Sequence, residues 1–185
     1  MEKTQENLLK AFTGESMARN KYNFFAKKAR QDGLEWIARI FEETADNERA
    51  HAEREYEFIK GKVEMTNTYD ICPIGSTLEN LKAAAAGEKY EWGVMYSEFE
   101  KTAREEGQNA VADVFKEIGE VEEKHEERYL KLVEFLDKDL LFNSEEEIEW
   151  KCLNCGYIHK GKSAPKVCPA CGKPQGFYMQ LNVLR

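Results

Sequence analysis

The first part of this 185-residue chain contains two copies of one pattern, and this repetition leaves few architectures open. When residues 29–54 are shifted by 74 positions, ten of the 26 residues match. Upstream, a shift of 73 aligns Gly14 and Glu15 with Gly87 and Glu88. A repeated pair of helices predicts a bundle with pseudo-two-fold symmetry. The matched pairs are Ala29/Ala103, Arg30/Arg104, Gly33/Gly107, Ala38/Ala112, Phe41/Phe115, Glu43/Glu117, Glu48/Glu122, His51/His125, Glu53/Glu127 and Arg54/Arg128.

Residues 1 to about 136 have the periodicity of helices, with clear breaks between them. Apolar residues recur at every third or fourth position, and the first proline is Pro73. Single glycines in RQDGLE (30–35) and REEGQN (104–109) predict tight turns between antiparallel helices. A longer connection spans residues 60–76. Four helices joined by a short, a long and a short connection predict an all-α, ferritin-like four-helix bundle with one long crossover.

Two of the three histidines, His51 and His125, each follow a glutamate by three residues. This spacing puts carboxylate and imidazole on one helix face, one turn apart. On all four helices, steps of three and four place a glutamate among apolar residues that face the core. The four seams are Leu8, Ala11, Glu15, Ala18, Tyr22 and Phe25; Ile37, Phe41, Thr44, Glu48, His51, Glu55 and Phe58; Leu81, Ala85, Glu88, Trp92, Met95 and Phe99, with Glu91 one turn beyond Glu88; and Val111, Phe115, Ile118, Glu122, His125, Tyr129, Leu132 and Leu136.

A solvated surface position is the simplest explanation for any single glutamate, because 34% of the residues are charged. It does not explain the set, since five carboxylates converging in a core cannot all stay ionised without a cation. Two metal ions remove the conflict, and the residues match the ligands of carboxylate-bridged di-iron bundles. Oxygen-rich sites with two imidazoles favour iron or manganese. The predicted ligands are Glu15, Glu48, His51, Glu88, Glu122 and His125, with Glu91 as a further carboxylate.

A different site is predicted near the C-terminus, where four of the five cysteines form two C-x-x-C pairs. Four thiolates predict a tetrahedral site for zinc or for a single iron. About 38 residues cannot bury an adequate core, so the metal is expected to supply most of the folding energy. The cysteines are Cys152, Cys155, Cys168 and Cys171.

The predicted organisation is therefore a bundle over residues 1–140 and a small, metal-stabilised, β-rich domain over residues 148–185. Short strands are expected around Trp150 and over residues 176–184. Cys72, beside Pro73 in the crossover, has no predicted role.

Charge and hydropathy exclude several classes of function. The net charge is -8 with acidic and basic residues interspersed, so no basic face for nucleic acid is expected. No apolar run is long enough for a membrane span, and the N-terminus lacks the pattern of a signal peptide. Cysteines in tight pairs indicate metal binding rather than a secreted disulfide framework. A cytoplasmic protein is expected.

The motifs GESMARNKY, ADNERAH, AGEKYEWGVMY, EVEEKHEERY and CLNCGYIH with CPACG occur in this order. With them the chain resembles the rubrerythrin family over nearly its full length. CGYIH followed by CPACG is similar to rubredoxin, and this favours iron over zinc at the four cysteines. The resemblance implies that Glu48 and Glu122 bridge two irons.

The same resemblance implies further roles for individual residues. Glu15 is a terminal ligand of one iron, and Glu88 and His125 are ligands of the other. Glu91 exchanges with His51 as the redox state changes, and Tyr22 and Tyr96 line the site.

By resemblance the activity is a peroxidase that reduces hydrogen peroxide to water in oxidative-stress defence. Electrons pass through the rubredoxin-like iron from rubredoxin or an NAD(P)H-linked reductase, between the subunits of a head-to-tail homodimer. A ferritin-like ferroxidase or oxidase, and a non-enzymatic zinc-ribbon adaptor, are the alternatives. The physiological donor, the preference for peroxide over dioxygen and exchange of helices between subunits stay open.

Overall fold

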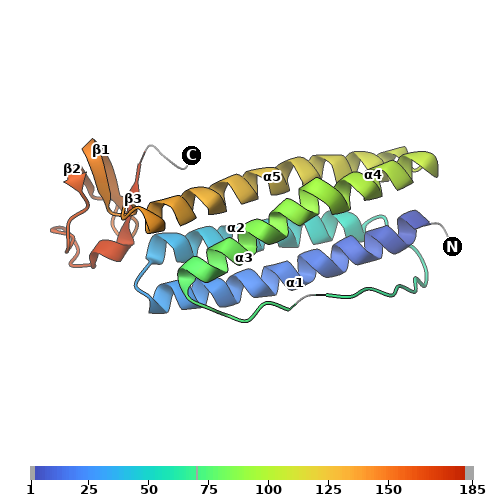
Figure 1. The fold of residues 1–185 in the computed structure, drawn as a ribbon, viewed down its shortest axis with the longest axis horizontal. Helices are drawn as coiled ribbons and strands as arrows, with labels where there is room; N and C mark the ends of the chain where they lie inside the picture. Colours follow the sequence, from blue (N-terminus) through green and yellow to red (C-terminus); the bar gives the residue numbers. More distant parts are fainter. Residues whose placement is uncertain (1–2, 70, 182–185) are drawn as a thin grey trace.

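A computed structural model describes residues 3–69 and 71–181 as a long helical bundle with a small β-rich module at one end (Figure 1). The module lies at the opposite end from the N-terminus. The elements are α1 (Lys3–Gln31), α2 (Glu35–Tyr56), α3 (Thr77–Tyr90), a π-helical turn (Glu91–Met95), α4 (Tyr96–Glu105), α5 (Asn109–Asp137), β1 (Asn143–Cys152), β2 (Ile158–Ser163), a 3₁₀ turn (Gln175–Phe177) and β3 (Tyr178–Gln180).

The two predicted glycine turns are confirmed, and they have the same hydrogen bonds. Gly33 and Gly107 adopt φ of 78° and 73°, which is the left-handed region that glycine enters without steric cost. Leu34 N–H donates to Ala29 O at 2.9 Å, and Gln108 N–H donates to Ala103 O at 2.8 Å. These bonds across five residues are those of the Schellman motif, so each hairpin turns sharply and its helices become antiparallel neighbours.

The third predicted helix is interrupted by the π-helical turn, which contains Glu91. The Tyr96 N–H bonds to Glu91 O, five residues back, as in a π-helix. A π-helical turn inserts one residue into an α-helix, and this explains why the repeat has a shift of 73 before it and 74 after it.

The insertion overturns part of the predicted third seam. Trp92, Met95 and Phe99 were expected in the core, but they are only partly buried. Tyr96 and Ala103 are buried instead, because the added residue rotates the helix after it by one position.

The crossover runs along the bundle from one end to the other beside α1 (Figure 1). At its start the Gln5 side chain donates to Phe58 O at 3.0 Å and accepts from Lys60 N–H at 2.9 Å. At its end Ser76 and Glu79 form a capping box, which satisfies the first amides of α3. The crossover therefore enters and leaves the bundle through side-chain hydrogen bonds.

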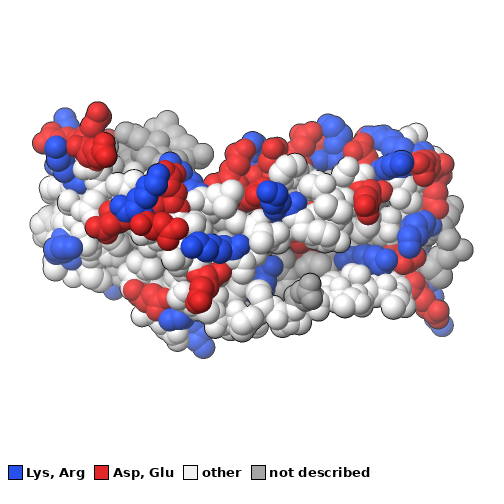
Figure 2. Space-filling view, viewed as in Figure 1, with Lys and Arg blue, Asp and Glu red and all other residues white. Residues whose placement is uncertain are grey.

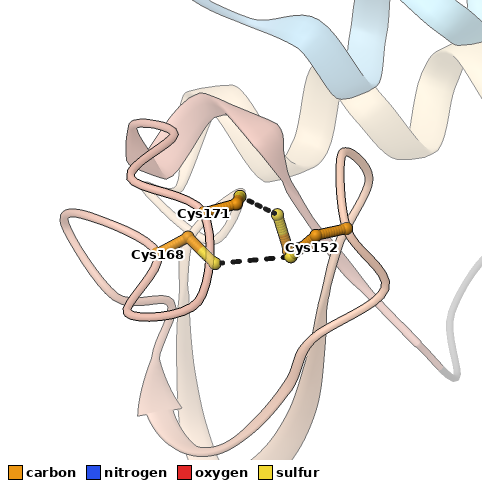
Figure 3. Close-up of side chains that lie close together, drawn as sticks. Cys152, Cys168 and Cys171 are labelled. Carbon is orange, nitrogen blue, oxygen red and sulfur yellow. Dashed lines mark hydrogen bonds between the residues drawn. The ribbon is translucent and has the colours of Figure 1, made fainter.

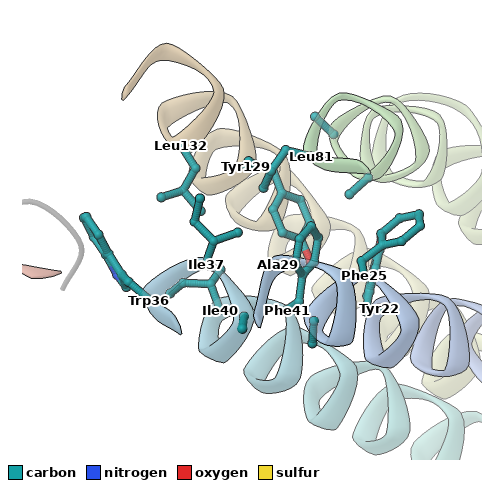
Figure 4. Packing of buried hydrophobic residues seen from close by; sticks show 14 of the residues in the cluster. Tyr22, Phe25, Ala29, Trp36, Ile37, Ile40, Phe41, Leu81, Tyr129 and Leu132 are labelled. Atoms are coloured by element: carbon teal, nitrogen blue, oxygen red, sulfur yellow. The ribbon is translucent and has the colours of Figure 1, made fainter. Parts of the chain in front are cut away.

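The bundle core consists of two hydrophobic clusters separated by a polar layer. The larger cluster packs Tyr22, Phe25, Phe41, Tyr129 and Leu132 with their neighbours at the module end (Figure 4). The smaller one packs Leu8, Ala11, Tyr96, Val111 and Phe115 at the other end. Burial of these side chains excludes water on both sides of the polar layer.

The C-terminal module is a three-stranded antiparallel sheet in the order β2-β1-β3. Trp150 is fully buried in its core together with Cys152 and Tyr178. The predicted strand around Trp150 is confirmed as β1, which begins at Asn143 because this residue pairs with Ser163. The second predicted strand is confirmed over Tyr178–Gln180, and its last residues, 182–184, lie outside the described part of the chain.

The module packs against the end of the bundle. Arg39 donates to Leu153 O at 3.1 Å, and the Gln180 amide donates to Leu140 O at 2.8 Å. Gly176 fits against the α1–α2 turn so closely that a Cβ atom there would lie 1.6 Å from Gly33 O. Only glycine allows this approach between the two backbones.

Gly176→Ala is therefore expected to displace the module from the bundle, because the added methyl group overlaps a backbone oxygen. Hydrogen exchange should accelerate in the α1–α2 turn and in residues 175–181, with the helices near the metal groups unaffected. Gly14→Ala is the matched control, since a Cβ at this helical position meets nothing within 4 Å. Unchanged exchange in Gly176→Ala would show that the contact does not hold the module.

Lys and Arg side chains alternate with Asp and Glu on the face of the molecule shown in Figure 2. Among the described residues, no helix combines the length and the apolar character that crossing a membrane requires.

Candidate metal centres

The polar layer brings together glutamates and histidines from all four helices. α1 supplies Glu15, α2 supplies Glu48 and His51, α3 supplies Glu88, and α5 supplies Glu122 and His125. The four glutamates are at most 1% exposed. They are buried because the helical period that aligns the apolar residues of each helix also places its glutamate on that face.

These residues form two groups that share two carboxylates. Glu15, Glu48, His51 and Glu122 present ligand atoms within 4.8 Å of one another, and so do Glu48, Glu88, Glu122 and His125. Glu48 and Glu122 therefore lie between the two groups, which is the placement of carboxylates that bridge two metal ions.

Distances within the groups show how closely the side chains converge. His51 Nδ1 lies 2.8 Å from Glu122 Oε1 and 3.0 Å from Glu48 Oε2. His125 Nδ1 lies 2.6 Å from Glu122 Oε2 and 3.5 Å from Glu48 Oε1. Each imidazole thus faces both shared carboxylates.

Several buried polar atoms of the polar layer lack a hydrogen-bond partner within the described residues. Such atoms are rare in folded proteins and require an explanation. Two cations would satisfy them, because each orphaned atom is a potential ligand. Those that belong to the two ligand groups are Glu15 Oε2, Glu48 Oε1, Glu48 Oε2, His51 Nδ1, Glu88 Oε2 and Glu122 Oε1. The residues therefore fit a pair of metal ions.

Electrostatics lead to the same conclusion. Burial raises the pKa of Glu15, Glu48 and Glu88 well above the usual value, and neighbouring carboxylates raise it further. Burial opposes ionisation of Glu122 too, but the adjacent imidazoles of His125 and His51 outweigh it and lower its pKa. Burial disfavours the charged form of His51, yet Glu122 raises its pKa to about 9. Without cations, the layer must hold extra protons.

The two predicted tyrosines each hydrogen-bond one glutamate of the two ligand groups. Tyr22 donates to Glu88, and Tyr96 donates to Glu15. A shift of 74 relates Tyr22 to Tyr96, so the two contacts are pseudo-symmetric. Both hydroxyls are buried, and each holds the carboxylate of a helix from the other repeat.

Glu91 and Glu55 differ from the other carboxylates of the layer. Within the described residues, Glu91 belongs to neither metal group; it lies in the π-helical turn, and burial followed by repulsion from Glu122 raises its pKa to about 7. Glu55 was not among the predicted site residues, but it is fully buried and lies 2.9 Å from the Tyr96 hydroxyl. Its position on the seam of α2, four residues after His51, was the signal for it.

The four cysteines of the module converge as predicted. Cys152 Sγ lies 3.7 Å from Cys171 Sγ, and Cys155 Sγ lies 3.7 Å from Cys168 Sγ. In Figure 3, Cys152, Cys168 and Cys171 point toward one another. A tetrahedral metal with bonds of about 2.3 Å to sulfur separates the sulfurs by about 3.8 Å, so the observed spacing fits one ion.

The thiols also respond to one another electrostatically. Burial opposes ionisation of Cys168, but nearby hydroxyl and backbone N–H donors outweigh it and lower its pKa to about 6. The Tyr157 backbone N–H favours the thiolate of Cys155, yet burial and the other cysteines raise its pKa to about 12. Four adjacent thiols cannot all ionise without a cation.

The fold and the two sites define a di-iron carboxylate bundle with an attached rubredoxin-like module. The rubrerythrin family model matches residues 6–133, and the model for the rubredoxin-like domain of rubrerythrin matches residues 150–178. The chain belongs to the rubrerythrin family.

Curated relatives match over most of their length. Rubrerythrin of Porphyromonas gingivalis is 49% identical over 177 residues, which cover 95% of this chain and 88% of the relative. Rubrerythrin of Nitratidesulfovibrio vulgaris is 43% identical over 182 residues, which cover 98% and 95%.

Solved structures agree with the fold. A nigerythrin in its mixed-valence state superposes with a TM-score of 0.66 at 36% identity, covering 96% of this chain and 86% of that chain. A bacterioferritin of Mycobacterium tuberculosis superposes with a TM-score of 0.66 at 20% identity, covering 75% and 88%, and shows the fold alone. The predicted ferritin-like fold and the two kinds of metal site are confirmed.

Proposed function

We propose that this protein is a peroxidase that reduces hydrogen peroxide to water in defence against oxidative stress. Its electrons come from rubredoxin or an NAD(P)H-linked reductase and pass through the iron of the four-cysteine site. A pair of ferrous ions bound in the bundle would supply the two electrons that cleave one peroxide into two waters.

The observation that carries this proposal is the sharing of Glu48 and Glu122 between two ligand groups. Shared carboxylates hold two metal ions as neighbours, so that both can act on the two oxygens of one peroxide. In this assignment Glu15 and His51 complete one group, and Glu88 and His125 complete the other. A relative, nigerythrin, has been solved in mixed-valence and fully reduced, all-ferrous states, which supports redox-active iron in this family.

Glu91 and the tyrosines have supporting roles in the proposal. Glu91 would be the carboxylate that exchanges with His51 as an iron ligand when the redox state changes. Tyr22 and Tyr96 orient Glu88 and Glu15 through their hydroxyl hydrogen bonds. The hydrophobic clusters on either side keep bulk water from the reacting groups.

The position of the module favours electron transfer between two copies of the chain. Along α2, Glu48 is about 15 residues from the Gly33 turn that the module contacts, and this corresponds to roughly 20 Å. So long a path slows direct electron transfer from the four-cysteine site to the bundle site of the same chain. A head-to-tail homodimer, which would place the module of one subunit near the bundle of the other, shortens the path.

The test is an anaerobic reaction of the iron-loaded, fully reduced protein with one equivalent of hydrogen peroxide. The visible absorption of the thiolate-bound iron should return rapidly, because the bundle draws electrons from the module after it reacts. Peroxide that leaves the absorption bleached, while dioxygen restores it, would favour the ferroxidase or oxidase alternative. Absence of colour after loading with iron would favour the zinc-ribbon adaptor.

A further inference from the structure

Glu55 is a fully buried carboxyl group that neither metal group uses. It lies on α2 one turn beyond His51, and its exposed fraction is 0%. Its Oε1 atom lies 2.9 Å from the Tyr96 hydroxyl oxygen. Its Oε2 atom has no hydrogen-bond partner in the described part of the chain. An ionised glutamate in this position would be a buried charge with a single neutral partner, which is costly.

The number of hydrogen atoms on Glu15, Tyr96 and Glu55 limits which of them can donate a hydrogen bond to which. The Tyr96 hydroxyl contacts both Glu15 and Glu55, but a phenol has only one hydrogen to donate. In the assignment above Glu15 is a metal ligand and is therefore ionised, so it accepts the hydrogen of Tyr96. The contact between Glu55 and Tyr96 then needs a hydrogen on Glu55. Burial, the largest influence on this carboxyl group, raises its pKa to about 8.

The internal repeat shows that this acid occurs on one side of the site only. A shift of 74 relates Tyr96 to Tyr22, and it relates Glu55 to Tyr129. The Tyr129 ring packs 5.6 Å from the Tyr22 ring, between centroids. Both positions are fully buried. The half of the site that contains Glu15 therefore has a carboxylic acid where the half that contains Glu88 has a phenol.

We propose that Glu55 acts through Tyr96: it holds a proton beside the di-iron site and passes it to Glu15 through the Tyr96 hydroxyl. The inference rests on the proposed peroxidase function and names the residue that supplies one of its protons. Glu55 donates to the Tyr96 oxygen, and Tyr96 donates to Glu15, so the three groups form a directed chain.

Peroxide reduction requires a supply of protons at the site. When one hydrogen peroxide becomes two waters, the O–O bond breaks, two O–H bonds form, and two electrons and two protons are consumed. The two electrons would be supplied by the pair of ferrous ions that the ligand groups would hold, and these ions would become ferric. One proton moves from Glu55 to the Tyr96 oxygen, while the Tyr96 proton moves to Glu15 and on to a product oxygen. Solvent supplies the second proton and restores the proton on Glu55.

The test compares iron-loaded wild-type protein with Glu55→Gln, in which the amide still donates to Tyr96 but has no acidic proton. Infrared spectra of the iron-loaded protein should contain a carbonyl band of a protonated carboxyl group that Glu55→Gln lacks. Oxidation of the fully reduced variant by peroxide should be slower by about 100-fold, the lower range of general-acid contributions. Iron content should not change.

Glu53→Gln is the matched control, because Glu53 lies on the same helix and is exposed. It should keep both the infrared band and the wild-type rate. Glu55→Leu removes the hydrogen bond to Tyr96 as well as the acidic proton, and its oxidation by peroxide should be as slow as that of Glu55→Gln.

Wild-type oxidation rates in Glu55→Gln, or an infrared spectrum that this substitution leaves unchanged, would overturn the inference. So would loss of rate in Glu55→Leu alone, since this would show that Glu55 only orients Tyr96. Failure of the proposed function has a different signature: wild-type protein would be inert to peroxide, although the infrared band would still support a proton on Glu55.

Discussion

Glu122→Ala is expected to lose at least one bundle iron and to reduce peroxide turnover at least about 100-fold, while the colour of the four-cysteine iron persists. Glu122 belongs to both ligand groups, and its two oxygens face His51 at 2.8 Å and His125 at 2.6 Å. No other side chain can replace it, because its helix supplies only this carboxylate to the layer. Iron analysis and stopped-flow oxidation by peroxide measure the two effects.

The control for this substitution is Glu120→Ala on the same helix. Glu120 is exposed and forms a surface ion pair with Lys116, so its removal should leave stability nearly unchanged and both bundle irons bound. If Glu122→Ala retained two bundle irons and wild-type turnover, Glu122 would not be a shared ligand.

Removal of the metal ions should reverse the usual pH dependence of stability. Without cations, the free energy of unfolding of the bundle should fall by several kcal/mol between about pH 5 and pH 8, because the layer holds protons that the unfolded chain releases. Burial raises the pKa of Glu91 from 4.5 to about 7 and that of Glu55 to about 8. Glu15, Glu48 and Glu88 shift in the same direction.

The sign follows from proton binding in the two states. Between the pKa of an unfolded glutamate and the raised pKa in the fold, the folded chain binds more protons, so stability decreases as pH rises. His51 adds to this trend, since Glu122 raises its pKa from 6.5 to about 9 against the effect of burial. Glu122 has a lowered pKa, and its contribution is lost only below the unfolded value of 4.5.

Chemical denaturation of chelator-treated protein, followed by helical circular dichroism at several pH values, measures this dependence. The iron-loaded protein is the comparison, and its stability should rise with pH over the same range because metal ligands must be deprotonated. Metal-free protein that became more stable from pH 5 to pH 8 would contradict the charge distribution described for the layer.

Local sequence patterns were sufficient for most of the fold and for the residues that converge in the two candidate metal centres. Gly33 and Gly107 marked the turns because a left-handed residue is a local requirement of the backbone. The spacing of Cys152, Cys155, Cys168 and Cys171 indicated one metal site because each pair forms a knuckle within a few residues. Glu48 and His51 were recognised because helical periodicity places them on the buried face.

The tertiary structure decided what depends on contacts between distant segments. The π-helical turn at Glu91–Met95 moved Tyr96 into the core, and only the packed bundle shows where that extra residue is accommodated. The pairing of Tyr96 with Glu15 and Glu55 joins three helices, so no single seam contains it. The contact of Gly176 with Gly33 joins the module to the bundle, and neither segment predicts it. Periodicity determines which face of a helix is buried, whereas the partners of a buried polar atom depend on how the helices pack.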